Sequence, residues 1–249
     1  MLDPTQWAAA LAIALFAGAA SGITSFGAGM MLSAYLVPIL GAKVTVPALA
    51  VAMLLTNLSR IWAFRGAVSF RPALQVMAGL VPTAVIGSLI FVRMSSTVAD
   101  LVVGLFLVLS IPLRRWISGR QAAVPPAGMA AGGALIGVIS GMTTGAGSLL
   151  VPLFLGAGLT GAGLIATDAV VAVAMHITRS LTYGRFALLD SELLLLGLTL
   201  GLATVPGSYI AAWIVRRTSL KVHTLVIEAL VVLAGGIAAG RALWSMLAP

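Results

Sequence analysis

Long apolar runs separated by short charged stretches cover almost the whole chain. A helix that crosses a bilayer needs about 20 apolar residues. The pattern predicts helical membrane segments at 7–40, 44–64, 72–91, 98–113, 127–159, 162–183, 193–215 and 225–247. Two of them, 7–40 and 127–159, are too long for one ordinary span, and each holds a stretch rich in glycine and hydroxyl residues. We therefore expect an all-α polytopic membrane protein whose helical segments are broken at these two stretches.

The two broken segments carry similar motifs. Residues 21–38 read Ser-Gly-Ile-Thr-Ser-Phe-Gly-Ala-Gly-Met-Met-Leu-Ser-Ala-Tyr-Leu-Val-Pro, and residues 140–152 read Ser-Gly-Met-Thr-Thr-Gly-Ala-Gly-Ser-Leu-Leu-Val-Pro. Irregular backbone at membrane depth is tolerated where it lines a polar cavity, and a half-helix that begins there points free N–H groups at a bound anion. Close helix packing through small residues is the alternative. The candidate binding residues here are Thr24, Ser25, Gly27, Gly29, Thr143, Thr144, Gly145 and Gly147.

An internal repeat is the strongest signal in the sequence. The Ser-Gly pairs that open the two motifs lie 119 positions apart, and so do Arg60 and Arg179. Chance matches of glycine and alanine are expected in this composition, but an aligned arginine inside a membrane segment is not. We expect an N-terminal transmembrane repeat at 1–121, a linker at 122–126 and a C-terminal repeat at 127–249.

The topology depends on the broken segments. If each one crosses the membrane once, the two repeats are parallel; if each one dips in and returns, they are inverted. Lys and Arg near the segment ends divide 7 against 5 between the two sides in the first case and 8 against 4 in the second. The bias of basic residues toward one side favours the inverted arrangement, and both arrangements stay open.

Two arginines within membrane segments are candidates for contacting a substrate. Asn57 precedes Arg60 by three positions and His176 precedes Arg179 by three, so each pair shares a helix face. Arginine presents a planar fork of donors that suits oxyanions, and charged residues inside a membrane usually mark a pathway or a partner. Both arginines also lie near segment ends, where snorkelling to the headgroups is the alternative.

Three further ionisable residues are candidates for coupling transport to an ion gradient. His176 changes charge near neutral pH, and Asp168 lies eight positions before it, two turns away on roughly the same face. Glu228 is an isolated carboxylate in the last segment. The alternatives are a first-turn or loop position for Asp168 and pairing with an arginine for Glu228.

Composition narrows the class of protein. Hydrophobic residues make up 61% of the 249 residues and charged residues 8%, against about 25% charged in soluble proteins. A net charge of +8 fits basic loops of a membrane protein, so we expect a lipid bilayer and no nucleic acid as partner. The chain has no cysteine and no nucleotide-binding glycine loop, and we expect no cofactor and no metal.

The two motifs resemble those of the TauE/SafE family of sulfite exporters and related organosulfur-anion transporters. The resemblance rests on the paired Ser-Gly, Gly-Ala-Gly and Val-Pro elements, and it covers nearly the whole chain. The family has Gly-Gly-Gly at the position where this sequence has Gly-Ala-Gly. It implies a secondary transporter of sulfite, sulfoacetate or similar small anions in the bacterial inner membrane, driven by H⁺ or Na⁺, and an oligomer is compatible with it. The site would lie between the two breaks.

Two other function classes are alternatives to a secondary transporter. An intramembrane serine hydrolase would use Ser140 as nucleophile and His176 as base. However, Ser140 has a counterpart in Ser21, while His176 aligns with Asn57, and a hydrolase needs one nucleophile. An anion channel is the other class, and it predicts ohmic currents without coupling to pH.

Overall fold

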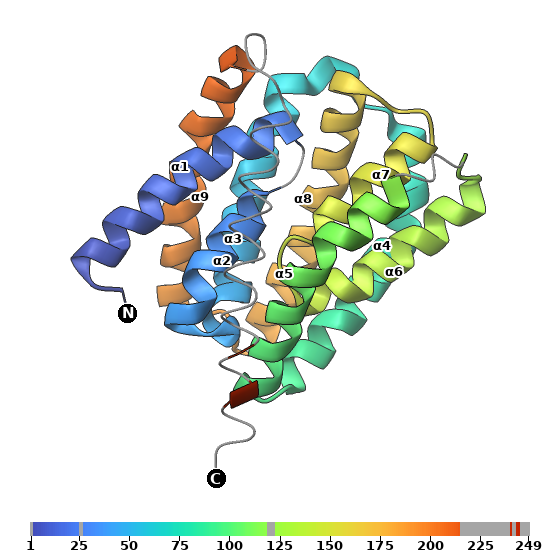
Figure 1. Cartoon of the computed structure of the whole chain (residues 1–249). Coiled ribbons are helices and arrows are strands. Elements are labelled where there is room, and N and C mark those ends of the chain that lie inside the picture. Colours follow the sequence, from blue (N-terminus) through green and yellow to red (C-terminus); the bar gives the residue numbers. More distant parts are fainter. Residues whose placement is uncertain (1, 25–26, 119–122, 215–239, 241–242, 245–249) are drawn as a thin grey trace.

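The computed structural model describes residues 2–24, 27–118 and 123–214, together with 240, 243 and 244, and every regular element in these ranges is a helix (Figure 1). The elements are α1 (Pro4–Thr24), α2 (Ala28–Leu40), α3 (Ala42–Phe64), η1 (Arg65–Ala67), α4 (Phe70–Arg93), α5 (Ser96–Ser118), α6 (Pro126–Met142), η2 (Ala146–Leu149), α7 (Leu150–Gly156), α8 (Gly161–Arg185) and α9 (Ser191–Ile214). The expectation of an all-α protein is confirmed. The segment expected at 225–247 lies outside the described residues, apart from 240, 243 and 244.

Helices α1 and α6 both stop at a glycine-containing connection. The backbone resumes at α2 and at η2, and the residues just before these elements, Gly27 and Gly145, have φ angles of 111° and 85°. L-residues with a side chain rarely adopt such angles, so glycine is needed at both turns. α1 continues through Thr24, so its stop comes later than the Ser-Gly that opens the motif.

After each stop the chain turns back. Tyr35 of α2 donates a hydrogen bond to the carbonyl of Gln6, near the start of α1, at 3.3 Å. The amide of Val124, just before α6, donates to the carbonyl of Gly156, the last residue of α7, at 2.8 Å. Each broken segment therefore begins and ends at the same end of the molecule. Neither one runs straight through.

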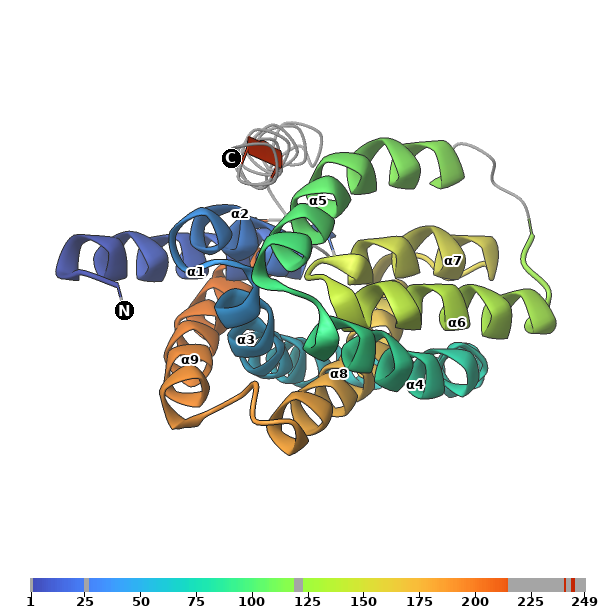
Figure 2. The same ribbon diagram turned by 90° about the horizontal axis from the view of Figure 1, so that it is seen from below.

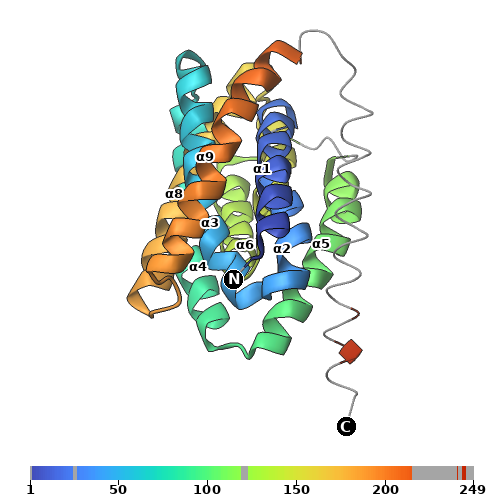
Figure 3. The ribbon, with the colours of Figure 1, turned by 90° about the vertical axis from the view of Figure 1, so that its left-hand side faces the viewer.

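Two pairs of helices that are not consecutive in the sequence, α4 with α6 and α1 with α9, pack closely through glycine. A Cβ added to Gly79 of α4 would meet the backbone of Ala130 in α6, and one added to Gly133 would meet that of Val76. In the same way, a Cβ at Gly207 of α9 would meet the backbone of Leu15 in α1. Figure 3 shows α1 and α9 side by side, and Figure 2 shows the α1–α9 and α4–α6 pairs on either side of α3 and α8.

Two hydrophobic clusters form the interior. The first is built from α1, α2, α3, α5 and α9, with Phe91 and Tyr183 from the ends of α4 and α8. The second is built from α4, α6, η2, α7 and α8. Met53 of α3 belongs to the first cluster and Met175 of α8 to the second, so the two clusters meet between these helices.

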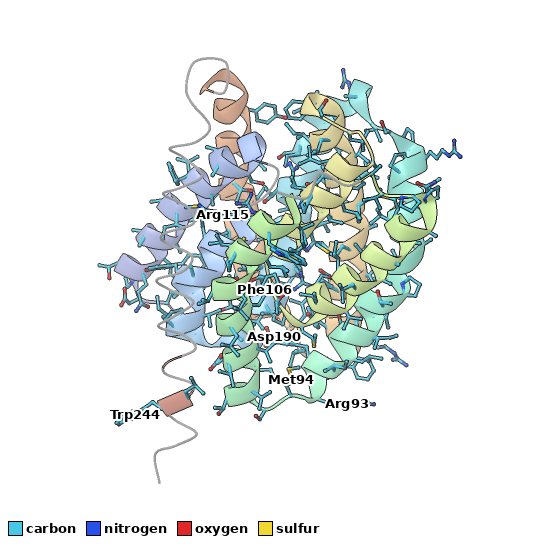
Figure 4. All side chains as sticks on the ribbon, turned by 45° about the vertical axis from the view of Figure 1, so that its right-hand side comes forward. Arg93, Met94, Phe106, Arg115, Asp190 and Trp244 are labelled. Atoms are coloured by element: carbon cyan, nitrogen blue, oxygen red, sulfur yellow. The ribbon has the colours of Figure 1, made fainter. Side chains whose placement is uncertain are left out.

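The outer surface is apolar, as a lipid-facing surface must be. Among the described residues five helical stretches are long and apolar enough to cross a membrane: Pro4–Gly22, Ala42–Ala67, Phe70–Arg93, Ser96–Ile117 and Gly161–Arg185. Exposed leucines lie along shorter helices as well, with Leu135 of α6 and Leu195 of α9 each 65% exposed. Exposed charged side chains lie toward the two ends: Figure 4 labels Arg115 toward one end and Arg93 and Asp190 toward the other. This is a multi-pass membrane protein.

Candidate functional site

A cavity of about 50 Å³ lies where the two glycine connections meet α3 and α8. Its lining is polar in part and comes from both ends of the sequence. The lining residues are Ser21, Gly27, Ala28, Gly29, Met53, Asn57, Arg60, Gly145, Gly147, Ser148, Asp168, Ala172, Met175 and His176. The cavity thus lies on the boundary between the two hydrophobic clusters, with α2 and α3 on one side and η2 and α8 on the other.

A buried ion pair forms part of the cavity wall. Nη2 of Arg60 in α3 lies 2.7 Å from Oδ2 of Asp168 in α8, and the two side chains are 3% and 2% exposed. Nη2 of Arg60 also donates to the carbonyl of Ile165 at 3.3 Å. Asp168 lies seven residues inside α8, so the alternative of a loop or first-turn position is wrong. The burial of Arg60 likewise excludes snorkelling to the headgroups.

Asn57 holds Arg60 in place. Its Oδ1 accepts a hydrogen bond from Nη1 of Arg60 at 2.7 Å, and its Nδ2 donates to the carbonyl of Met53, one turn earlier, at 2.7 Å. The amide is thereby satisfied on both sides, which fixes its orientation. The face sharing that we expected from the spacing of Asn57 and Arg60 is present as a direct bond.

Several buried polar atoms of the cavity lining have no hydrogen-bond partner. They are Nε of Arg60, Oδ1 of Asp168, Nδ1 of His176 and Oγ of Ser148. Leaving such an atom unpaired costs about 1–3 kcal/mol, more when it is charged. These atoms therefore define a polar surface that a small ligand with several acceptor or donor atoms would satisfy.

The two glycine connections touch each other at the cavity. A Cβ added to Gly29 in the first turn of α2 would lie 3.6 Å from the amide nitrogen of Gly145, and 3.4 Å from Sδ of Met53. Ser33 of α2 and Thr144 of the second connection share a hydrogen bond between their hydroxyls. The first-turn amides of α2 thus start at the cavity, and this end of a helix attracts negative charge.

Arg179 lies behind this wall and not in the cavity lining. It is 1% exposed, and its Nε and Nη2 have no hydrogen-bond partner. Its guanidinium carbon lies 5.8 Å from the centre of the Tyr183 ring, and the Tyr183 hydroxyl donates to the carbonyl of Gly141 at 2.6 Å. Snorkelling is excluded for Arg179 too, because the side chain is buried away from the surface.

The remaining sequence candidates fall into two groups. Thr143 and Thr144 are buried beside the cavity, where Thr143 donates to the carbonyl of Ile139 at 3.0 Å, but neither lines it. The side chain of Thr24, and the whole of Ser25 and Glu228, lie outside what the structure describes.

Sequence reasoning did not name six of the lining residues as candidates: Ser21, Ala28, Met53, Ser148, Ala172 and Met175. Ser148 directly follows the second Gly-Ala-Gly, and its hydroxyl could have been counted with those of the motif. Met53 and Met175 carry no polar signal, since methionine in an apolar helix is ordinary core material. Among the described residues no cluster of three or more His, Asp or Glu side chains is placed to hold a metal ion.

Comparison with known protein families identifies the family to which the chain belongs. The model of the family described as Sulfite exporter TauE/SafE matches residues 10–238. The chain belongs to this family. Searches against curated proteins and against solved structures gave no match.

Membership in the TauE/SafE family makes the protein a transporter with a small anionic substrate, and not an enzyme. The serine hydrolase alternative is therefore wrong. The geometry agrees, because the Ser140 hydroxyl donates to the carbonyl of Gly137 in its own helix at 2.8 Å, and Ser140 does not line the cavity that contains His176.

Proposed function

We propose that this chain is a secondary transporter of small organosulfur anions in the bacterial inner membrane, and that the substrate binds in the cavity between the two glycine connections. The observation that carries the proposal is the convergence in one buried cavity of both glycine connections and the guanidinium of Arg60. Family membership supports the substrate class.

The charge of the buried site favours an anion. Among the residues that the structure describes, two arginines, Arg60 and Arg179, lie close to the site, and Asp168 is the one carboxylate that lines the cavity. With His176 neutral, the buried groups carry one net positive charge, and burying an uncompensated charge is costly. A bound anion offsets that excess of positive charge, and the amides at the start of α2 add to the attraction.

The size of the cavity favours a small substrate. A buried water needs roughly 10–15 Å³ of such space, so 50 Å³ accommodates about three to five waters. Sulfite, with one sulfur and three oxygens, matches this room better than sulfoacetate, which adds a carboxymethyl group. We therefore favour sulfite as the substrate among the organosulfur anions.

Alternating access follows from the way the two repeats interlock. We take residues 1–121 and 127–249 as inverted repeats joined by 122–126, which the returning chain after each glycine connection supports. The moving bodies are then the two hydrophobic clusters and not the sequence halves, because α9 packs in the first cluster and α4 in the second. The cavity lies between these clusters, where a rocking motion would open it to one side and then the other.

Replacement of Asn57 tests the site. In proteoliposomes, Asn57→Leu should reduce the rate of saturable [³⁵S]sulfite uptake at least about tenfold, because the guanidinium of Arg60 loses a buried hydrogen bond and its orientation. Leu58→Ala is the matched control: Leu58 is the next residue on α3 and is 45% exposed on the outside of the bundle, so uptake should stay at the wild-type rate.

The same assay separates the competing functions. Uptake that saturates and is accelerated by sulfite inside the vesicles identifies a carrier. A non-saturating, ohmic flux would replace the proposal by an anion channel. Equal uptake by Asn57→Leu and wild type, in protein that elutes as one species from gel filtration, would remove the cavity from the transport path.

A further inference from the structure

The Arg60–Asp168 ion pair links two helices across the cavity wall. It joins α3 of one hydrophobic cluster to α8, which belongs mainly to the other, and it forms part of the cavity wall. Asp168 is bound through Oδ2 alone, while its Oδ1 has no partner. On the other side, Nε of Arg60 also has no partner. Each member of the pair thus retains an unused hydrogen-bonding atom in a buried place.

An oxyanion in the cavity needs the same guanidinium. Of the Arg60 donors, Nη1 is held by Asn57, Nη2 by Asp168 and the Ile165 carbonyl, and Nε has no partner. A substrate that takes two parallel bonds through Nε and Nη2 therefore has to take over a bond that Nη2 already makes. Two negative groups cannot both approach within a few ångströms of one cation in a buried site without strong repulsion. Substrate and Asp168 are therefore competitors for Arg60.

This inference rests on the proposed function. We propose that the substrate anion displaces Asp168 from Arg60, and that the displaced Asp168 takes up one proton from the side of the membrane to which the cavity is then open. A buried carboxylate without its counter-charge is neutralised because the cost of keeping it ionised is too high. When the anion leaves, Asp168 returns its proton to the solvent and pairs with Arg60 again. One proton then travels with each anion.

Among the described residues, no other charged or titratable group on the helices around the cavity fits the role of proton acceptor as well. α6, η2 and α7 carry no charged residue. On α3, Lys43 lies at the far end, and Arg65 of η1 and Arg71 of α4 are exposed beyond the cavity. On α8 itself, His176 lines the cavity but bonds neither Arg60 nor Asp168, Arg179 lies behind the wall, and Arg185 is exposed in the last turn. The proton acceptor that exchanges partners is Asp168.

Binding measurements on the purified protein test this inference. Calorimetric titration with sulfite, repeated in buffers of different ionisation enthalpy, gives the number of protons taken up. Wild type should take up about one proton more per sulfite than Asp168→Asn. Because both proteins meet the same sulfite species, the difference belongs to the protein. Asp168→Asn should also bind sulfite about tenfold more tightly or better, since a charged competitor for Arg60 is gone.

Infrared difference spectroscopy makes the test independent of how well the variant folds. Saturating wild type with sulfite should produce the C=O stretch of a protonated carboxyl group. The band should be absent from Asp168→Asn with sulfite bound, and it should persist in Leu58→Ala, the matched control on the outer face of α3, because that variant leaves the cavity and the Arg60–Asp168 pair intact.

The outcomes separate the two proposals. Absence of the carboxyl band in wild type, its persistence in Asp168→Asn that still binds sulfite, equal proton uptake in wild type and Asp168→Asn, or weaker binding by Asp168→Asn would each overturn the coupling role of Asp168 and leave the transporter in place. Wild type that neither binds nor transports sulfite would overturn the proposed function itself.

Discussion

Lys43 illustrates how single residues tie the ends of the membrane helices together. Its Nζ donates to the carbonyls of Phe91 and Val92, in the last turn of α4, at 2.6 and 3.0 Å, and lies 5.0 Å from the centre of the Phe91 ring. Helix C-termini carry unpaired carbonyls and partial negative charge, so a lysine there satisfies both. At the start of α3, Oδ1 of Asp100 accepts from the amide of Ala42 at 2.5 Å.

We expect Lys43→Met to lower the free energy of unfolding by about 1–2 kcal/mol, because two carbonyls lose a charged donor that solvent replaces only in part. Thermal unfolding in detergent measures the change. Arg93→Met, an exposed basic residue at the same end of the molecule, should unfold within about 0.5 kcal/mol of wild type. An equal loss in both variants would show that net charge matters and the specific bonds do not.

Spacing along one helix predicts which residues share a face, but it does not predict contacts between residues on different helices. Local spacing predicted that Asn57 and Arg60 share a face, because three positions make nearly one helical turn. The same logic picked Arg60 and Asp168 separately, but their pairing joins residues 108 positions apart and depends on how α3 packs on α8. The sequence therefore indicated an arginine available to a substrate, while the structure shows one whose charge is already matched.

At the scale of the element, close contact between α4 and α6 depends on glycine. A Cβ at Gly79 would clash with the backbone of Ala130 and lie 2.8 Å from the amide nitrogen of Ala134. Backbone cannot yield as a flexible side chain can, so the helices must move apart. Packing that is strained in this way costs about 1–3 kcal/mol or more.

Gly79→Ala should therefore lower the thermal unfolding temperature in detergent by several degrees, despite the higher helix propensity of alanine. Gly184→Ala is the matched control, since a Cβ there meets nothing within 4 Å, near the end of α8; it should leave the unfolding temperature unchanged or raise it slightly. If Gly79→Ala unfolds at the same temperature as Gly184→Ala, close contact between α4 and α6 does not depend on the glycine at position 79.

Hydropathy predicted the helix boundaries well, because apolar runs must be helical in lipid and charges mark their ends. The expected segment at 162–183 is α8 (Gly161–Arg185), and that at 72–91 is α4 (Phe70–Arg93). Which helices pack together was not predicted, because every helix is apolar and glycines occur in most of them. The pairing of α4 with α6 and of α1 with α9 thus depends on how the surfaces of these helices fit together.

At the scale of the whole molecule, the direction in which α8 runs separates the two topologies. The amide of Ser69, just before α4, bonds Oγ1 of Thr167 in α8 at 3.0 Å, so the first part of α8 lies beside the α3–α4 connection. At the other end of α8, the Tyr183 ring lies 5.8 Å from that of Phe91, in the last turns of α4. The connections at 65–69 and at 186–190 therefore lie at opposite ends, as inverted repeats require.

The chain has no cysteine, so single cysteines can report this arrangement without a background. We expect Gly66→Cys in right-side-out membrane vesicles to be shielded from an impermeant maleimide, because Arg65, Arg71, Arg114 and Arg115 gather at that end and the basic end faces the cytoplasm. Ser95→Cys and Ser191→Cys, both exposed at the other end, should be labelled. Parallel repeats with single crossings would instead place Gly66 and Ser191 on the same side, so labelling of both or of neither would refute the inverted arrangement.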